Sequence, residues 1–599
     1  MTARFDESMK SPLQSWMRAL ELTAPIDRRE SPTLPVLLES LAERYGAAPA
    51  LTDRTTSLSY RELADAANRQ ARWARGHELA PGEVVCLLMH NCPDYLAIWL
   101  GLTRVGVVVA LLNTNLSGEA LAHSINIVSP RYVIVAPSLI PALRTAQPHV
   151  IGLVGYLAYG PCEPTEFSRL DLELARLPAA KLTEDDCPAP ALDDRALHIY
   201  TSGTTGLPKA ANVSHLRLMQ WSHWFAGLMN TQPDDRMYNC LPLYHSVGGV
   251  VATGATLVSG GTVVLRERFS ASDFWRDVVE ERCTLFQYIG ELCRYLVARA
   301  PQPLDRQHSL RLCCGNGLRA DVWEAFQERF GIPRILEYYA ATEGSFSLYN
   351  CEGRPGAIGR IPPFLSHRMQ VALVKFDPAL DAPLRNESGR CVRCGVDEPG
   401  EAIGQIASAG GQQGGRFEGY ADAGASEKKI LRDVFAQGDA WYRTGDLMRK
   451  DAQGFFYFVD RVGDTFRWKG ENVSTGEVTA VVTSCPGIAD AAVYGVAVPG
   501  ADGRAGMAAI VVDTEFDLTA FRQHVATRLP EYARPLFLRI VAAIEITGTF
   551  KLRKQELALE GFDPAKVTDP LYFDDRQQEA YVSLDLTLQE RLRTGTIRV

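Results

Sequence analysis

The stretch IYTSGTTGLPKAANVSH, residues 199–215, contains the residue types that bind phosphate groups. Gly203 and Gly206 permit positive φ angles and a close approach of the backbone, whose successive N–H groups can form an anion-binding nest. Four hydroxyl residues could donate further hydrogen bonds: Thr201, Ser202, Thr204 and Thr205. A surface turn would explain the glycines and hydroxyl groups, but it would not also explain the strand-like lead-in and the positive charge of Lys209.

The spacing differs from that of the nucleotide P-loop. That motif, G-x-x-x-x-G-K-[ST], places a hydroxyl residue after the lysine, where it binds magnesium. Here Pro208, which lacks a donor N–H, precedes Lys209, and Ala210 and Ala211 follow it. The stretch therefore predicts a phosphate-binding loop of another kind.

Five further short motifs follow the loop along the chain. They are GNGL (Gly315–Leu318), YYAATEG (Tyr338–Gly344), WYRTGDL (Trp441–Leu447), DRVGDTFRWKGENVS (Asp460–Ser474) and TGTFKLRK (Thr547–Lys554). Each alone is weak, since a lone TEG is usually a turn and an Asp after TG usually caps one. In this order, the six motifs resemble those of the adenylate-forming superfamily, which contains acyl-CoA synthetases, luciferases and peptide-synthetase adenylation domains.

The resemblance implies roles for individual residues. Those that it places on ATP or AMP are Thr201, Ser202, Gly203, Thr204, Thr205, Gly206, Lys209, Gly315, Asn316, Gly317, Tyr339, Asp446 and Arg461. Thr342 is expected near the α-phosphate, and Glu343 is expected to bind Mg²⁺. Lys551 matches the catalytic lysine of the C-terminal loop, although its position alone would favour an exposed loop lysine. Lys469 matches a lysine that relatives bring into the site when the lid turns about a hinge near Gly463; an exposed hinge lysine is the alternative.

The superfamily reaction explains why these residue types are needed. A carboxylate attacks the α-phosphate of ATP to give acyl-AMP and pyrophosphate, and the thiolate of coenzyme A then displaces AMP. Two like charges ~4 Å apart cost on the order of 4 kcal/mol at an effective dielectric constant of ~20, so cations must stand between the reactants. Mg²⁺ on Glu343, together with Lys209 and Lys551, would supply them.

The stretch LPLYHSVGG, residues 241–249, bears on the substrate. Relatives that activate amino acids carry an aspartate here for the substrate ammonium group, whereas this chain has Tyr244 and His245. A buried cation without a carboxylate partner is costly, so amino acids are disfavoured. Tyr244 and His245 are assigned to the acyl substrate, where His245 would gate an acyl tunnel or contact the adenylate; a core histidine is the alternative. The stretch YIGE resembles the substrate-side strand end of the family, which assigns Tyr288 and Gly290 to the acyl substrate as well. An acyl tunnel and ordinary core packing stay open for three aromatic residues: Trp221, Trp224 and Phe225.

Other stretches point to one branch of the superfamily. QYIGELCRYL, RFEGY, GDTFRWKGENVSTGEV and DPLYF resemble the fatty acid transport proteins and very-long-chain acyl-CoA synthetases, and this resemblance covers nearly the whole chain. It implies a ligase that joins long- or very-long-chain fatty acids to coenzyme A, with ATP and Mg²⁺. Two alternatives are an acyl-AMP ligase that passes its product to a carrier protein, and a lipid-uptake protein with little catalysis. Intact Lys209, Glu343, Asp446 and Lys551 argue against the last.

Alternating apolar runs and helical patterns must position these residues. From Val84, VVCLLM, GVVVALL and RYVIVAP read as buried strands, with helical patterns between them, which indicates parallel βαβ units. Short strands rich in Gly and Pro follow over residues 353–457. We predict an α/β fold with a large N-terminal domain of parallel βαβ layers over residues 1–461, which includes that β-rich subdomain. A small, mobile α+β lid domain is expected over residues 462–599.

Composition excludes several classes of function. The chain has 599 residues, 22% of them charged and 46% hydrophobic, which is typical of a globular protein with more than one domain. Its net charge of −9, without a basic stripe, disfavours nucleic acid as a partner. The N-terminal region lacks the apolar segment of a signal peptide. Arg104 and two glycines interrupt the apolar residues 95–113, which favours a buried helix and strand over a membrane span.

The cysteines indicate the compartment. The thirteen cysteines have no regular spacing, and the pair Cys391 and Cys394 has no second pair or nearby histidines to complete a zinc site. We therefore expect a turn between short strands at this pair and a reducing, cytoplasmic compartment. Peripheral contact with the inner face of a membrane and formation of a homo-oligomer are left open.

Overall fold

The computed structural model describes residues 11–597 except 164–165, 202–206, 378–379, 381, 408–414, 463, 469–470, 500, 502, 546–553 and 595. The chain forms two compact units. The first contains Met1–Arg368 and Ile406–Ile430, and the second contains Met369–Gln405 and Leu431–Val599. The predicted boundary between residues 461 and 462 falls inside the second unit and stays a prediction.

A seven-stranded sheet forms one part of the first unit. Its strand order is β7 (Ser168–Arg169), β6 (Gly155–Ala158), β5 (Tyr132–Val135), β3 (Val84–Leu88), β4 (Val108–Leu111), β8 (Arg195–Thr201) and β9 (Lys209–Ser214). All neighbouring strands are parallel except β8 and β9, which are antiparallel. The predicted parallel βαβ units are therefore confirmed, whereas β9 was not predicted as a strand.

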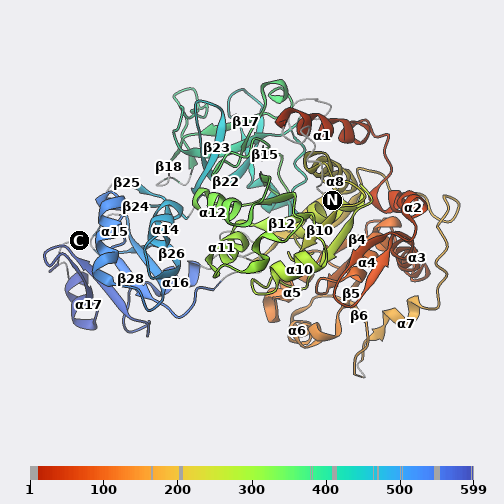
Figure 1. Cartoon of the computed structure of the whole chain (residues 1–599), viewed down its shortest axis with the longest axis horizontal. Coiled ribbons are helices and arrows are strands. Elements are labelled where there is room, and N and C mark those ends of the chain that lie inside the picture. The colour runs from red at the N-terminus through yellow and green to blue at the C-terminus, as the bar shows by residue number, and fades with distance from the viewer. Residues whose placement is uncertain are drawn as a thin grey trace. The chain divides into compact units, whose positions relative to one another are not determined.

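Helices cover both faces of this sheet (Figure 1). Val85 and Leu87 of β3 pack with α4 (Pro93–Arg104), and Cys86 and Leu88 pack with α5 (Gly118–Asn126), because successive side chains of a strand point to opposite faces. The elements around α4 and α5 are α1 (Pro12–Asp27), α2 (Leu34–Tyr45), α3 (Tyr60–Gly76), α6 (Ile140–Ala146) and α7 (Leu170–Leu174).

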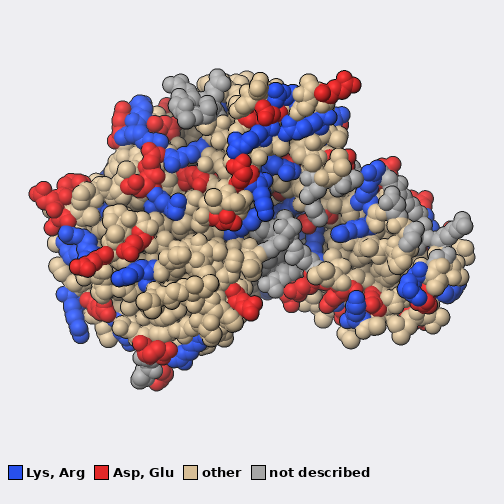
Figure 2. Space-filling model, turned by 180° about the vertical axis from the view of Figure 1, so that it is seen from behind, with Lys and Arg blue, Asp and Glu red and all other residues tan. Residues whose placement is uncertain are grey.

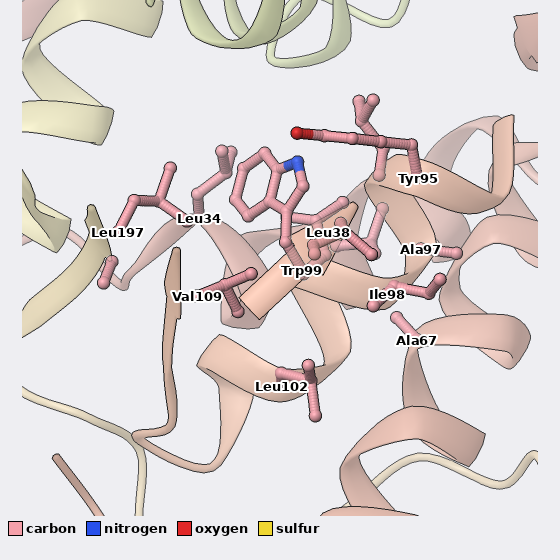
Figure 3. Packing of buried hydrophobic residues seen from close by; sticks show 14 of the residues in the cluster. Leu34, Leu38, Ala67, Tyr95, Ala97, Ile98, Trp99, Leu102, Val109 and Leu197 are labelled. Carbon is pink, nitrogen blue, oxygen red and sulfur yellow. The ribbon is translucent and has the colours of Figure 1, made fainter. Parts of the chain in front are cut away.

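Trp99 belongs to a core cluster of the first unit, part of which Figure 3 shows from close by. Its indole packs among aliphatic side chains of α2, α4, β4 and β8, including Leu34, Leu38, Val109 and Leu197. The apolar residues 95–113 thus form the buried helix α4 and the buried strand β4, as predicted. Within the ranges given above, no helix combines the length and apolar character needed to cross a bilayer.

A second set of paired strands in the first unit carries the GNGL and YYAATEG motifs. Its strand order is β16 (Gly359–Arg360), β15 (Ser347–Asn350), β14 (Ile335–Ala340), β13 (Leu312–Asn316), β12 (Leu285–Ile289), β10 (Arg236–Asn239), β11 (Thr262–Leu265), β1 (Pro49–Thr52) and β2 (Ser57–Ser59). Strands β10 to β13 are parallel to their neighbours and β14 is parallel to β13, so the carboxyl ends of these strands share one edge. The helices of this layer are α8 (His215–Met229), α9 (Thr253–Leu257), α10 (Phe274–Glu280), α11 (Gly290–Ala298) and α12 (Ala320–Phe330).

The second unit contains short antiparallel strands and a compact α+β part. Strands β17 (Val371–Val374), β20 (Gly400–Gln405), β22 (Ala440–Lys450) and β23 (Phe455–Arg461) pair in that order, in the predicted β-rich region. A five-stranded sheet follows, with β26 (Ile488–Ala497), β27 (Arg504–Val512), β28 (Phe537–Ile540), β29 (Leu571–Asp575) and β30 (Ala580–Ser583). It packs with α14 (Thr475–Thr483) and α15 (Leu518–Arg528) around its own core.

The surface charge is mixed. On the face that Figure 2 shows, Lys and Arg side chains lie interspersed with Asp and Glu side chains. This distribution accords with a composition of 62 basic and 71 acidic residues.

Candidate active site

A hairpin places the two ends of the phosphate loop side by side. Thr201 ends β8 and Lys209 begins β9, and the two residues are paired in register. The residues 416–421 run along the other side of β9, where Asn212 N donates to Gly419 O at 2.9 Å and Ala421 N donates to Ala210 O at 2.8 Å. The hairpin therefore lies beside the stretch RFEGY.

Tyr420 connects the phosphate loop to the TEG motif. Its hydroxyl donates to Glu343 Oε1 at 2.6 Å, and its ring lies 5.5 Å from Lys209 Nζ. Burial, reinforced by the negative charge of Glu343, raises the pKa of Tyr420 above its ordinary value, while a hydrogen bond with Thr201 acts in the opposite direction. The hydroxyl therefore stays protonated and holds the carboxylate of Glu343, which is only 5% exposed.

A buried arginine holds the backbone around this cluster. Arg217 donates to Thr342 O and to Arg416 O, each at 2.5 Å, and its Nε lies 3.6 Å from Glu418 Oε1. Ser214, at the N-terminus of α8, donates to both carboxylate oxygens of Glu418 through its hydroxyl and its N–H. Because this ion pair is buried and satisfied by hydrogen bonds, removing one partner would leave a costly unpaired charge.

The stretch predicted to bear on the substrate reaches the same cluster. The hydroxyl groups of Ser246 and Thr342 are 3.2 Å apart. The ring of His245 lies 4.6 Å from that of Tyr244, whose hydroxyl accepts from Asn115 Nδ2 at 3.2 Å. Burial raises the pKa of Tyr244 to about 12. Position 245 thus lies next to Ser246, whose hydroxyl contacts the TEG motif.

The carboxyl ends of β12 and β13 meet in a glycine-rich turn. A Cβ atom on Gly290 would lie 1.9 Å from Gly317 O, and one on Gly315 would lie 2.3 Å from Tyr288 O. Gly317 has a φ of +79°, which glycine adopts without strain. Asn316 Oδ1 is buried and has no hydrogen-bond partner among the described residues. The glycines therefore let the two strand ends approach closely, with a free acceptor beside them.

A buried carboxyl group supports this turn from below. Glu337 in β14 is 1% exposed, accepts from Leu318 N at 3.1 Å, and lies 2.5 Å from the hydroxyl of Tyr288. Burial raises the pKa of Glu337 to about 8, against the lowering effect of these hydrogen bonds. Tyr288, which we assigned to the acyl substrate, is thus a core residue bonded to Glu337, and that assignment stays a prediction.

The aromatic residues of α8 pack mainly against other rings. Trp224 lies 5.8 Å from Trp16 between ring centroids, and Phe225 lies 4.6 Å from Tyr338. Tyr339 lies edge-on to Phe346 at 5.5 Å. These contacts place Trp224 and Phe225 in the aromatic packing between α1, α8 and β14, which is the core alternative.

The WYRTGDL motif lies in the second unit. Asp446 in β22 is paired in register with Arg461 at the end of β23, and Asp446 Oδ1 lies 3.6 Å from Arg461 Nε. Asp446 is 8% exposed, and its N–H donates to Thr444 Oγ1 at 3.0 Å. The two predicted nucleotide contacts of this unit are therefore neighbours.

Several predicted site residues lie outside the described residues: Ser202, Gly203, Thr204, Thr205, Gly206, Gly463, Lys469 and Lys551. Other residues of the cluster were not assigned from the sequence. These are Tyr420, Arg217 and Glu418. Tyr420 and Glu418 lie in the stretch RFEGY, which the sequence analysis used only to identify the branch of the superfamily. The tyrosine next to a glycine in that stretch was the signal that could have identified Tyr420.

The cysteines form no disulfide bonds in the structure. All thirteen cysteines are free thiols, and Cys391 and Cys394 lie between short bridged segments. In the part of the chain that the structure describes, no group of three or more His, Cys, Asp or Glu side chains could hold a metal ion.

Comparison with known proteins gives the same family as the motifs. Residues 38–401 match the family model of the AMP-binding enzymes, and residues 477–551 match that of the AMP-binding enzyme C-terminal domain. Long-chain fatty acid transport protein 1 of Mus musculus is 40% identical over 575 residues, which are 95% of this chain and 88% of that protein. Long-chain fatty acid transport protein 6 of Homo sapiens is 40% identical over 566 residues, 94% of this chain and 90% of that protein.

Solved structures share the fold. The anthranilate CoA ligase AuaEII in complex with anthranoyl-AMP superposes with a TM-score of 0.75 at 19% identity, over 88% of this chain and 96% of that one. ATP-bound MatB from Rhodopseudomonas palustris superposes with a TM-score of 0.72 at 22% identity, over 88% of this chain and 98% of that one. The expected α/β architecture with a separate C-terminal part is confirmed.

Proposed function

Since the chain belongs to the family of AMP-binding enzymes, we propose that it activates long- or very-long-chain fatty acids to acyl-CoA thioesters. In the first step, a carboxylate oxygen of the acid bonds to the α-phosphorus of ATP, and pyrophosphate leaves. In the second step, the sulfur of coenzyme A bonds to the acyl carbon, and AMP leaves with the electron pair of the broken C–O bond.

The convergence of four chain segments on Tyr420 and Thr342 carries this proposal. Lys209 contacts the ring of Tyr420, whose hydroxyl holds Glu343, and the adjacent Thr342 contacts Ser246. One ammonium group, one carboxylate and three kinds of hydroxyl donor thus face a common region. Such a set suits a polyphosphate, since the lysine stabilises the leaving pyrophosphate and hydroxyl groups donate to phosphate oxygens.

The residues present fit a magnesium ion at Glu343. Its carboxylate is buried and oriented by Tyr420, and carboxylate oxygen is a preferred ligand of Mg²⁺, which usually takes its other ligands from substrate phosphates and water. When bound, the ion would neutralise phosphate charge during the approach of the fatty acid carboxylate. The chain's own contribution is to hold the carboxylate in place before the nucleotide arrives.

The glycine-rich strand ends suit the nucleotide base. We assign Gly315, Asn316 and Gly317 to the adenine side, because the glycines let the two strand ends pack closely and Asn316 Oδ1 offers an acceptor beside them. In the second unit, Asp446 would accept hydrogen bonds from the ribose hydroxyl groups, with Arg461 beside it. Tyr339, half-buried at the end of β14, is assigned to the nucleotide as well.

The substrate class rests on two observations. The positions next to the TEG motif carry Tyr244 and His245 and no carboxylate for an ammonium group, which disfavours amino acids. The two relatives described above are named as long-chain fatty acid transport proteins, which favours long acyl chains. Lys551 is proposed to stabilise the first transition state and Lys469 to act in the second step, both on the superfamily resemblance alone.

A lipid-uptake protein with little catalysis is the second candidate, which the names of these relatives favour. Pyrophosphate release distinguishes the two, measured across long-chain, very-long-chain, short-chain, aromatic and amino acids, with and without coenzyme A. A ligase gives one turnover without coenzyme A and many with it. Release in neither condition supports uptake alone, and a burst that coenzyme A does not accelerate supports transfer to a carrier protein.

Variants show whether the activity belongs to this site. Glu343→Gln should abolish most of the release, whereas Lys181→Ala should not. Lys181 is a matched surface control, because it is exposed and its ion pair with Glu43 lies outside the cluster. Equal activity of both variants would contradict the assignment of the site.

A further inference from the structure

A cavity of about 510 Å³ opens at the amino-terminal edge of the seven-stranded sheet. Residues before β3, the connection from α5 to β5, and the first residues of β8 line it. Its charged and polar lining includes Arg131, Arg195, His198 and Glu83, and the aliphatic lining includes Ile127 and Val128. A cavity of this volume is in the range of small-molecule sites.

The charged mouth of the cavity lies away from the candidate active site, although Ala421 of its lining follows Tyr420 in the chain. β8 runs from Arg195, at the cavity, to Thr201, at the phosphate loop. Six steps along a strand cover about 20 Å, so the two sites lie at opposite edges of the sheet. Nothing in the proposed reaction uses the cavity, and a ligand bound there would not displace ATP.

The floor of the cavity holds a buried imidazole with unused hydrogen-bonding capacity. His198 is 1% exposed, and its Nδ1 has no hydrogen-bond partner within the described ranges. Asn212 is paired with it in register on β9, and Asn212 Oδ1 likewise lacks a partner there. Burial, with the nearby charge of Arg195, lowers the pKa of His198 to about 3, so the ring is neutral. A buried polar atom without a partner is destabilising, and a hydrogen bond from a ligand would remove that cost.

The mouth of the cavity is positively charged. Arg131 and Arg195 are both exposed, and neither forms an ion pair with a described residue. Glu83 is the acidic residue of the lining, and its carboxylate already accepts from Ala80 N at 2.9 Å. Two guanidinium groups and one carboxylate leave the lining with a net positive charge, which attracts anions. Guanidinium groups match the geometry of phosphate oxygens through paired hydrogen bonds.

Aliphatic side chains complete the lining. Val84, Ile127 and Val128 lie along its walls, and Leu153 at the rim is fully exposed, at 100%. Ile151, two residues earlier, is 80% exposed. An inorganic ion would leave this apolar wall and the buried imidazole without contacts, whereas an organic phosphate would use both.

We propose that this cavity binds an organic phosphate, with the phosphate group at Arg131 and Arg195 and the organic part against the aliphatic wall and His198. The phosphate belongs either to a free phosphate ester or to the headgroup of an anionic glycerophospholipid, since both present the same chemistry. Exposed Leu153 at the rim is compatible with either source.

The test compares the full-length protein with the double variant Arg131→Gln/Arg195→Gln. Glycerol 3-phosphate and inorganic phosphate are titrated by calorimetry, and sedimentation with phosphatidylcholine vesicles, with and without phosphatidylglycerol, is measured in parallel. Hydrogen bonds to charged groups contribute about 1.5–3 kcal/mol, so we expect glycerol 3-phosphate to bind at least ~10-fold more weakly to the double variant. Because the candidate active site is unchanged, binding there is common to both proteins and cancels in the comparison.

Two further variants sharpen the test. Arg144→Gln removes an arginine that lies outside the cavity and is paired with Glu166, so it should bind like the wild type. His198→Phe keeps a buried ring but removes its nitrogen atoms, so it should fold normally and lose affinity. Equal affinity of wild type and double variant for glycerol 3-phosphate, or unchanged affinity in His198→Phe, would overturn the proposal.

The two sources give different results. Free phosphate ester as the ligand predicts binding of glycerol 3-phosphate without sedimentation on phosphatidylglycerol vesicles. A lipid headgroup predicts sedimentation that glycerol 3-phosphate inhibits and that the double variant loses. Sedimentation that is equal in the wild type and the double variant would show that lipid binds elsewhere and would refute the lipid source.

Discussion

Replacing Tyr420 by Phe tests whether the observed cluster is the site of adenylate formation. The substitution removes one hydroxyl group, which donates to Glu343 Oε1 at 2.6 Å, and keeps the aromatic ring that lies 5.5 Å from Lys209 Nζ. The contact with the lysine is therefore retained while the restraint on the carboxylate is lost. Glu343 is 5% exposed, so water replaces the lost donor poorly.

The size of the effect follows from the type of hydrogen bond. A hydrogen bond to a charged group contributes about 1.5–3 kcal/mol, compared with about 1 kcal/mol for a neutral pair. If the restraint acts on the transition state of adenylation, kcat/KM for ATP in pyrophosphate release should fall roughly 10- to 150-fold. The dependence on Mg²⁺ concentration should shift to higher values, because the ligand is no longer held in place.

Tyr60→Phe is the matched control. Tyr60 is buried, like Tyr420, and lies far from the cluster in sequence. Its hydroxyl donates to a neutral carbonyl group, Gly261 O, at 2.8 Å. It should lower the free energy of unfolding by about 1 kcal/mol and leave adenylation unchanged. Less than a twofold loss of kcat/KM in Tyr420→Phe, with unchanged Mg²⁺ dependence, would refute the role of the Tyr420–Glu343 contact.

Four other outcomes are expected. Lys209→Ala should raise the KM for ATP by an order of magnitude or more with little change in Tm, and a normal KM in a destabilised protein would indicate a structural lysine. Glu343→Gln should lose activity that added magnesium partly restores, so an unaltered magnesium profile would count against a ligand role. Burial raises the pKa of Glu337 to about 8, so the folded protein keeps a proton that the unfolded chain releases above about pH 4.5. The stability contributed by this group therefore falls as pH rises from about 4.5 to about 8. Glu337→Gln should lack this decline, and the same pH dependence of the free energy of urea unfolding in both proteins would contradict the prediction. Lys551→Ala should block acyl-AMP formation yet still convert supplied acyl-AMP and coenzyme A to thioester. Lys469→Ala should instead impair thioester formation more than acyl-AMP formation. Equal losses in both half-reactions would contradict an alternating lid.

Local patterns in the sequence were sufficient to predict several strands and helices of the first unit and the chemical types of the candidate site residues. The strands β3, β4 and β5 and the helices α4 and α5 follow from apolar runs and helical periodicity, because burial on two faces or on one face imposes those patterns directly. The order of six short motifs identified the family, and each motif is contiguous, so no knowledge of the fold was needed to find it.

Strand β9 could not be predicted from the pattern of its own residues. Residues 209–214 are a short stretch with little apolar character, and they are extended because β8 pairs with them on one side and residues 419–421 lie along the other. Strand β8 is near in sequence, but residues 419–421 are distant, and such a partner leaves no periodic signal in the strand itself. The end of the phosphate loop at Lys209, and hence the direction of its side chain towards Tyr420, depends on this pairing.

The residue types and their spacing by themselves determined the family, the candidate phosphate loop and the carboxylate at Glu343. Only the tertiary structure decided that Tyr420 holds that carboxylate, that Arg217 bonds to the backbone at Thr342, and that Tyr288 faces the buried Glu337. The physical reason is that these contacts join residues 49 to 125 positions apart. Their geometry is set by how whole sheets and helices pack, and no single segment contains that information.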